Sequence, residues 1–150
     1  MNWSYVAGFF DGEGSVTRNG NGYRVTIPQT HEGVLKEMRR FTGYGTVMKT
    51  TARQKHWKQS WTFFISRQSL VKHFLNHVQP YLLVKRELVD QVLPVVTKMT
   101  EQNQEKLKRV RFYKHEAARL RLRGLSYRGI GKRLGLDWGY VRRLTLSRTK

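Results

Sequence analysis

The stretch Val6-Ala7-Gly8-Phe9-Phe10-Asp11-Gly12-Glu13-Gly14 decides the fold of this chain. It opens as an apolar helical run and ends in two carboxylates separated by a glycine. Gly8 and Gly12 lie four residues apart, on one helix face, where a second helix can approach backbone to backbone. Glu13 follows at the C-terminal end of the helix, where the last carbonyl groups lack helical partners. Because a carboxylate beside free carbonyls offers several oxygen ligands, this end suits a hard cation such as Mg²⁺.

The same nine residues resemble the signature motif of the LAGLIDADG homing endonucleases. Val6 stands at the leading Leu, and Glu13 stands at the second acidic position, which carries the metal-binding carboxylate in that family. The flanking residues Trp3-x-Tyr5 and Ser15-Val16 also fit. The alternative is a buried helix followed by a Gly-rich turn in which Asp11 and Glu13 are merely solvated, since acidic Gly-rich turns are common.

The composition favours a polyanionic partner. The chain has 29 Lys plus Arg against 10 Asp plus Glu, a net charge of +19, and nucleic acid is the commonest partner for such a balance. The basic residues are interleaved with aromatic and strand-like segments rather than gathered on one amphipathic helix, which disfavours a membrane surface. We therefore expect double-stranded DNA as the partner, with no membrane and no small-molecule substrate.

Two absences narrow the cellular setting. The chain has no cysteine, which excludes disulfides and Cys-based zinc sites. No apolar run approaches the length of a membrane span, and the N-terminus lacks a signal-peptide pattern. We expect an intracellular protein, in the cytoplasm and nucleoid or in an organelle, and not a secreted one.

Periodicity predicts alternating helices and strand pairs over residues 1–99. Turn signals flanked by alternating residues indicate hairpins, whereas apolar residues at helical spacing indicate helices. Pro94 is expected to kink or end the last of these helices. The predicted helices cover residues 2–12, 32–42, 68–78 and about 83–93, and the predicted strands cover 15–19, 23–27, 44–51 and 57–66.

This α-β-β-α-β-β-α order is the one that the LAGLIDADG resemblance implies, an α+β fold with a saddle-shaped sheet. Longer members of the family carry the motif twice and act alone, whereas this chain carries it once, so the resemblance implies a homodimer. The first helices of the two copies would meet through the small residues Ala7, Gly8 and Gly12.

The resemblance also implies a site-specific endonuclease that cuts both strands of a long pseudo-palindromic DNA site. Two symmetry-related Glu13 side chains, with the backbone carbonyl of Gly12, would bind Mg²⁺ or another divalent cation such as Mn²⁺. The family places a polar residue after the second strand and a lysine after the third helix near the catalytic site, and Gln29 and Lys85 match these positions. A polar strand end and a surface lysine are the alternative interpretations. Asp11 is expected to close the helix end.

One face of the predicted sheet is expected to read the DNA. Strand alternation separates an apolar face from a polar one, whose side chains can hydrogen-bond to base edges. Phosphate contacts from the many Lys and Arg residues would supply most of the affinity. The DNA-contacting residues predicted from this alternation are Ser15, Thr17, Asn19, Arg24, Thr26, Lys58, Ser60 and Thr62.

The last third of the chain forms a separate pattern. Residues 101–150 hold 15 Lys plus Arg and 4 Asp plus Glu, a net charge of +11. Ser126 and Asp137 can each cap a short helix, and Gly135-Leu136 make a tight turn between these helices. Three short helices with such a turn resemble the helix-turn-helix unit of resolvases and transcription factors. A generic three-helix appendage is the alternative.

We accordingly expect three segments in the chain. Residues 1–99 would form the endonuclease core, residues 100–115 a linker or connecting helix, and residues 116–150 a DNA-binding extension. On the last helix of this extension, the residues expected to face the major groove are Tyr140, Arg142 and Arg143.

Other functions stay open at this point. A transcription regulator could keep the same scaffold and bind DNA without cutting it, although such a binder has no need of Glu13, Gln29 and Lys85 together. An RNA-splicing maturase would use the basic charge equally well. His73 and His77 have a helical i, i+4 spacing that suits a metal, but the H-E-x-x-H arrangement is absent, and a solvated helix face is the preferred interpretation.

Overall fold

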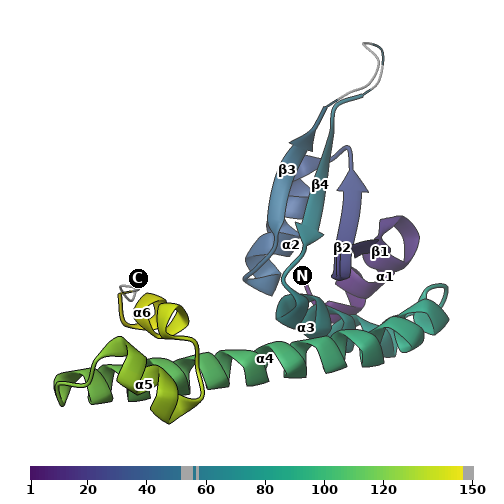
Figure 1. Ribbon diagram of the computed structural model, residues 1–150. Coiled ribbons are helices and arrows are strands. Elements are labelled where there is room, and N and C mark those ends of the chain that lie inside the picture. Colours follow the sequence, from purple (N-terminus) through teal and green to yellow (C-terminus); the bar gives the residue numbers. More distant parts are fainter. Residues whose placement is uncertain (52–55, 57, 147–150) are drawn as a thin grey trace. The chain divides into compact units, whose positions relative to one another are not determined.

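The computed structural model describes residues 1–51, 56 and 58–146. The chain divides into two compact units, Met1–Glu101 and Gln102–Lys150. None of the described helices combines the length and the apolar composition that a membrane crossing requires. The elements, in order, are α1 (Trp3–Glu13), β1 (Ser15–Asn19), β2 (Gly22–Gln29), α2 (Glu32–Thr42), β3 (Thr46–Thr50), β4 (Ser60–Ile65), α3 (Gln68–Val78), the 3₁₀ turn η1 (Gln79–Tyr81), α4 (Arg86–Leu122), α5 (Tyr127–Leu134) and α6 (Trp138–Leu146), as labelled in Figure 1.

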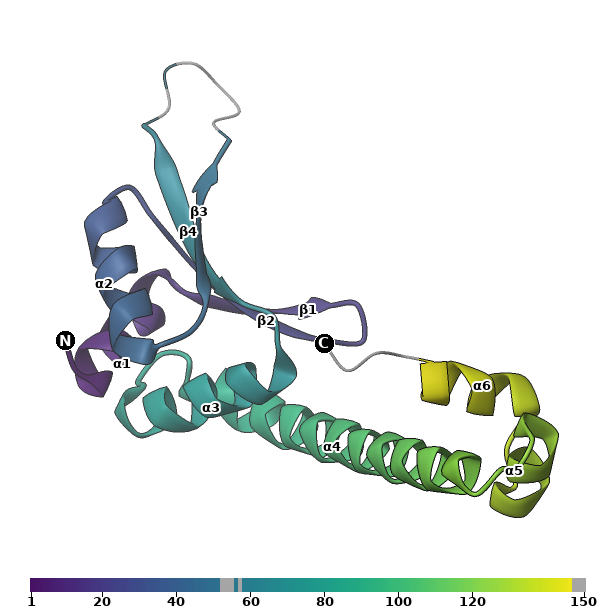
Figure 2. The ribbon, with the colours of Figure 1, turned by 90° about the vertical axis from the view of Figure 1, so that its left-hand side faces the viewer.

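The first unit is built on a four-stranded antiparallel sheet with the strand order β1-β2-β4-β3. Helices α1, α2 and α3 pack against one face of this sheet (Figure 2). The predicted α+β class and the α-β-β-α-β-β-α order are confirmed. β4 begins at Ser60, so Lys58, which we expected on that strand, precedes it. Residue 57, predicted to begin the strand, lies outside the described residues.

Side-chain alternation along β2 and β4 assigns every second residue to the core. Val25, Ile27, Phe63 and Ile65 are buried on the helix-covered face. Across the two strands, Val25 pairs with Ile65 and Ile27 pairs with Phe63. Because successive side chains of a strand point to opposite faces, the residues between them are directed to the other face of the sheet.

Helix α1 has a defined beginning and a defined end. The side-chain oxygen of Asn2 accepts the N–H of Tyr5 at 2.9 Å and caps the helix. The helix stops at Glu13 because the chain turns into β1 at Gly14. No side chain fits at position 14, since a Cβ there would meet the ring of Phe10 and lie 2.7 Å from its carbonyl oxygen.

Helix α4 differs from its prediction at both ends. It begins at Arg86 rather than near residue 83, and it continues through Pro94 to Leu122. We expected Pro94 to kink or end the helix, and the helix does not end there. Three valines at helical spacing on both sides of Pro94 are buried in the core of the first unit, and their packing outweighs the hydrogen bond that proline cannot donate. These are Val89, Val92 and Val96.

The second unit has a hydrophobic core of its own, formed by Ala117, Leu120, Ile130 and Val141. The hydroxyl of Ser126 caps α5 by accepting the N–H of Gly129 at 3.2 Å. Asp137 caps α6 by accepting the N–H of Tyr140 at 3.0 Å. Between the two helices, Gly135 has a left-handed φ of 67°, which favours glycine.

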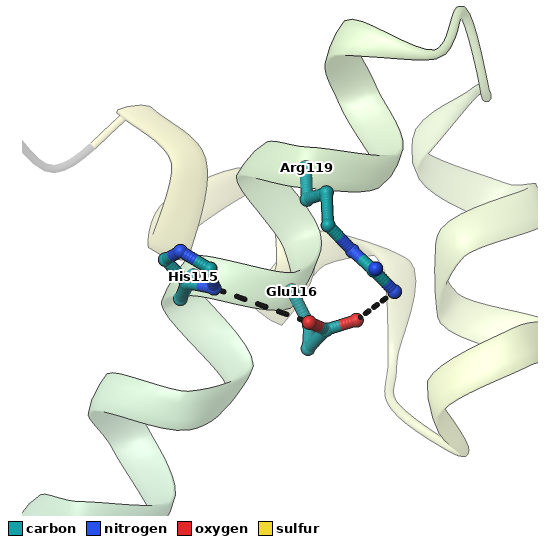
Figure 3. A network of polar contacts seen from close by, with 3 residues as sticks. All are labelled: His115, Glu116 and Arg119. Carbon is teal, nitrogen blue, oxygen red and sulfur yellow. Dashed lines mark hydrogen bonds and ion pairs between the residues drawn. The ribbon is translucent and has the colours of Figure 1, made fainter.

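The carboxylates of the second unit are engaged in local contacts. Glu116 binds Arg119 at 2.8 Å and lies 3.9 Å from Nδ1 of His115 (Figure 3). Glu105 lies 3.6 Å from an arginine one turn further along α4, and Asp137 caps α6. Residues 102–150 hold 15 Lys plus Arg against these three acids. The unit is therefore strongly basic.

Candidate functional site

The side chain of Asp11 joins the end of α1 to the segment before α4. Its Oδ2 accepts the backbone N–H groups of Leu83 at 2.8 Å and Val84 at 2.9 Å, and its Oδ1 accepts that of Lys85 at 2.7 Å. In return, Nζ of Lys85 donates a hydrogen bond to the carbonyl oxygen of Asp11. The amine of Lys85 is thereby held at the end of α1, which carries Glu13 two residues later.

These contacts set the charge state of Asp11. Burial raises the pKa of its carboxyl group, but the N–H groups of Val84, Leu83 and Lys85 and the charge of Lys85 outweigh burial, so the pKa lies below its usual value. Asp11 is therefore an anion committed to three backbone donors. It holds Lys85 in position and closes the helix end.

Glu13 is the last residue of α1, and its side chain is exposed. The N–H of Gly14 donates a hydrogen bond to the carbonyl oxygen of Phe10 at 2.8 Å. The amine of Lys85 donates one to the carbonyl oxygen of Asp11. Helical N–H donors are exhausted beyond this point. Glu13 thus stands at the junction of helix and sheet, in the same last helical turn as Gly12, whose carbonyl group lies beyond the reach of helical N–H donors.

Gln29 ends β2 and takes a different position from the other two predicted catalytic residues. It lies opposite Trp61 of β4, on the helix-covered face of the sheet. Its side-chain oxygen accepts the backbone N–H of Thr30 at 2.7 Å and the hydroxyl of Thr30 at 3.2 Å. The structure thus joins Lys85 to the end of α1, whereas Gln29 is bonded to its own neighbour.

The described residues of one chain do not form a complete metal site by themselves. No group of three His, Cys, Asp or Glu side chains that could hold a metal ion occurs among the described residues. Glu13 is one oxygen ligand, and the end of α1 adds carbonyl oxygens, which together suit a hard cation. The remaining ligands must come from water, from the substrate or from a second copy of the chain.

The outer side of α1 is bare. A Cβ atom at Gly8 or Gly12 would have no heavy atom of the chain within 4 Å. The rings of Tyr5 and Phe9 lie beside this glycine face and stack with centroids 6.1 Å apart. Ala7, which we expected at a dimer interface, is instead fully buried in the core of its own chain. The sequence pattern missed Tyr5 and Phe9, although their spacing puts them on the helix face of Gly8 and Gly12.

The face of the sheet away from the helices carries a regular array of side chains, which we call the outer sheet face. Thr26 faces Ser15 on one neighbouring strand, with their hydroxyls 2.7 Å apart, and Phe64 on the other. The hydroxyls of Thr50 and Thr62 lie 3.0 Å apart. The outer sheet face consists of Ser15, Thr17, Asn19, Arg24, Thr26, Pro28, Thr46, Met48, Thr50, Ser60, Thr62 and Phe64.

Seven of these residues were predicted from strand alternation. Thr46, Met48, Thr50 and Phe64 were missed, although the alternation of 46–50 carries the same signal, because Met48 and Phe64 are apolar and read as core residues. Met48 is 53% exposed. The outer sheet face therefore combines hydroxyl groups, one amide, one arginine and the apolar side chains of Pro28, Met48 and Phe64.

In the second unit, α6 buries Val141 and Leu144 and exposes Arg142 and Arg143. Tyr140 is half-buried, and its ring centroid lies 5.9 Å from the guanidinium carbon of Arg143. Two further cation and ring pairs were not predicted: Arg128 of α5 lies over the ring of Trp138, also at 5.9 Å, and Arg121 of α4 lies over the ring of Tyr127 at 4.6 Å. Arginines stacked on aromatic rings line this pair of helices.

Residues 2–79, just over half of the chain, match the family model of the LAGLIDADG-like domain. No curated protein sequence matches the chain. Among solved structures, the homing endonuclease I-CvuI in complex with its target, in the presence of 2 mM Ca, is similar with a TM-score of 0.52 and 19% identity, covering 99% of this chain and 84% of that one.

Two further structures have the same TM-score of 0.52. The archaeal intron-encoded homing endonuclease I-Vdi141I, complexed with DNA, is 16% identical and covers 95% of this chain and 92% of that one. The homing endonuclease I-TnaI is 24% identical and covers 68% of this chain and 76% of that one. At such identities the likeness establishes the fold.

Proposed function

The chain belongs to the LAGLIDADG-like domain family, and on this premise we propose that it is a site-specific DNA endonuclease that cuts both strands as a metal-dependent homodimer. The observation that carries the proposal is the contact between Lys85 and the end of α1. It joins a cationic amine to the helical turn that presents Glu13, from a segment more than 70 residues away. A carboxylate and an amine at one exposed helix end suit chemistry on a phosphate.

Phosphodiester hydrolysis requires an attacking water, stabilisation of charge on the phosphate and a route for the leaving oxygen. Glu13 and the carbonyl of Gly12 would hold Mg²⁺ or a similar divalent cation, which supplies a Lewis acid and a water of lowered pKa when bound. Lys85 would offset negative charge on the phosphate, and Gln29 would order water near it. Asp11 serves this arrangement by holding Lys85.

A homodimer would explain how the site can work with only one metal-binding carboxylate, that of Glu13, from each chain. Two copies related by a two-fold axis present the same surface to each other. The bare face of Gly8 and Gly12 lets two α1 helices approach closely, and both helices end at Glu13. The pair would therefore bring two carboxylates together, one for each DNA strand.

DNA binding would use both units. The outer sheet face offers hydroxyl groups and Arg24 to base edges, as the major groove requires. The second unit would extend the footprint through α6, with Arg142, Arg143 and the half-buried Tyr140 toward the groove. The structures of I-CvuI and I-Vdi141I contain bound DNA, which supports the same partner for this chain.

The proposal is tested by cleavage of a randomised DNA library in the presence of Mg²⁺. We expect double-strand cuts at one specific sequence. Glu13→Gln should keep DNA affinity but lose cleavage by about 100-fold or more, because a metal ligand contributes several kcal/mol at the transition state. Glu37→Gln is the matched control: it removes a carboxylate that forms only a surface ion pair with Arg40 at 3.0 Å, and cutting should be unchanged.

A second candidate function is a DNA-binding regulator that does not cut. The independent core of the second unit and its two capped helices favour this candidate. The same experiment separates the two functions. If wild type and Glu13→Gln both bind one sequence tightly and neither protein cleaves DNA, the nuclease function is rejected and the regulator function is supported.

A further inference from the structure

Arg24 lies on β2, one of the two central strands of the sheet, and its half-buried side chain packs against an aromatic ring. It faces Thr17 across the β1 pairing. Its guanidinium carbon lies 5.4 Å from the ring centroid of Phe64, within the range of a cation–π contact. A side chain held in this way presents its planar, fork-like donor group in a restricted orientation.

One donor of Arg24 is left unused by the protein. Its Nε is buried and has no hydrogen-bond partner among the described residues. A buried donor without an acceptor lowers stability. Local rules of this kind are broken chiefly at functional sites. Because Nε itself is enclosed, an acceptor brought by a ligand would be bound by the two terminal nitrogens of the guanidinium group.

The surroundings of Arg24 indicate what that ligand is. A hollow of about 260 Å³ on the outer sheet face is lined by Arg24, Thr26, Met48, Thr62 and Phe64, among others. None of the described residues that line it is acidic. Lys49, Thr50 and Thr51 line the rest of the hollow, and Lys49 pairs with Trp61, so strand alternation directs its side chain to the other face of the sheet. The hydroxyl of Thr62 contacts that of Thr50 at 3.0 Å. Met48 and Phe64 place apolar surface beside the guanidinium group of Arg24. The hollow offers bidentate donors next to apolar carbon.

This combination matches two base edges in the major groove. Arginine donates two parallel hydrogen bonds to O6 and N7 of guanine, and apolar side chains contact the methyl group of thymine. We propose that Arg24 reads a guanine in each half-site and that Met48 and Phe64 contact the methyl group of a neighbouring thymine. This inference rests on the proposed function, since it assigns the outer sheet face to the floor of the major groove. A central strand suits base contacts, whereas phosphates lie at the groove edges.

The inference is tested by selecting bound sequences from a randomised duplex library. The full chain is used in EDTA, so that no cleavage occurs, and wild type is compared with Arg24→Gln. Wild type should select guanine at one position of each half-site. Because glutamine pairs with adenine as arginine pairs with guanine, Arg24→Gln should replace that guanine by adenine, with discrimination of about 10-fold or more. Phe64→Leu should weaken the guanine preference.

Arg18→Gln is the matched control. Arg18 lies on neighbouring strand β1 opposite Tyr23, on the other face of the sheet, and the substitution removes the same charge. It should leave the selected sequence unchanged. A base profile of Arg24→Gln identical to that of wild type, or a uniform loss of affinity for all sequences, would overturn the assignment of Arg24. Failure of wild type to select any sequence would overturn the proposed function as well.

Discussion

Asp11 and Lys85 are 74 residues apart in sequence, and the carboxylate of Asp11 accepts the backbone N–H of Lys85 at 2.7 Å. Asp11 also accepts the two preceding N–H groups, and the Lys85 side chain returns to the Asp11 carbonyl. Of the two acids in the motif, Asp11 is therefore occupied within the chain, and Glu13 is the one that remains exposed.

Replacing Asp11 by alanine should destabilise the first unit. Three N–H groups lose their acceptor, and the expected loss is about 1–2 kcal/mol in the free energy of unfolding. This loss should depend on pH. The pKa of Asp11 in the folded protein lies below the ordinary value of 3.8, so its contribution is full above that value and disappears as the pH falls through the folded pKa.

Denaturant titrations of wild type and Asp11→Ala from pH 6 down to pH 2.5 measure this dependence. The two unfolding free energies should differ at pH 6 and converge in acid. A gap that stays constant over the whole pH range would show that the charge of Asp11 plays no part.

Gly8→Ala should affect folding and association in opposite directions. Alanine raises helix stability by about 1 kcal/mol over glycine, and the added Cβ meets nothing within the chain. The same methyl group would separate two α1 helices packed at Gly8. We expect a higher melting temperature at low protein concentration together with a dimer dissociation constant raised about 10-fold or more, since 1.4 kcal/mol of lost packing suffices.

Sedimentation and thermal melts of the same samples check both effects. Gly14→Ala is the contrasting variant, because its Cβ would clash with Phe10 and should lower stability outright. Unchanged self-association in Gly8→Ala would mean that the copies meet elsewhere.

Gly131 permits the close approach of α5 to the turn that follows it. A Cβ at this position would lie 2.7 Å from the carbonyl oxygen of Leu136. Gly131→Ala should therefore destabilise the second unit by about 1–3 kcal/mol and leave residues 1–101 unaffected. Hydrogen exchange followed by mass spectrometry resolves the two units. Gly129→Ala, where the nearest contact would be 3.4 Å, should be protected at least as well as wild type, because alanine favours the helix over glycine.

The double variant Arg142→Gln, Arg143→Gln tests the role of α6. Each phosphate contact that is lost should reduce the slope of log affinity against log salt concentration by about 1. Arg40→Gln provides the comparison, because Arg40 lies on α2 in an ion pair with Glu37. Equal slopes for wild type and the double variant would remove α6 from the interface.

The sequence predicted the elements whose signals are local. Helices 32–42 and 68–78 and the polar face of the hairpin follow from periodicity and turn residues, and they are confirmed. The start of α4 could not be predicted in this way, because the N–H groups that precede it are bound by Asp11, which lies far away in the sequence.

Pro94 does not end its helix and Ala7 is buried in its own chain, and these two differences from the expected structure have related reasons. Pro94 breaks an isolated helix, but its neighbours Val92 and Val96 are buried in the core of the first unit, and that packing is visible only in three dimensions. Ala7 is small, and a small residue can permit close approach to a second copy or to the chain's own core. Its helical phase relative to Val6 and Phe10 decides for the core. The roles of Glu13, Gln29 and Lys85 stay predictions.

The alternation along β2 and β4 has an evolutionary consequence. In these strands, core residues and outward-facing residues occupy alternate positions of the same short segments. Substitutions at the outward-facing positions can change the target preference, while the core positions stay the same and preserve the fold. A lineage of such proteins would then change its DNA sites quickly on an old and stable frame, and tolerance to substitution would rise and fall with every second residue.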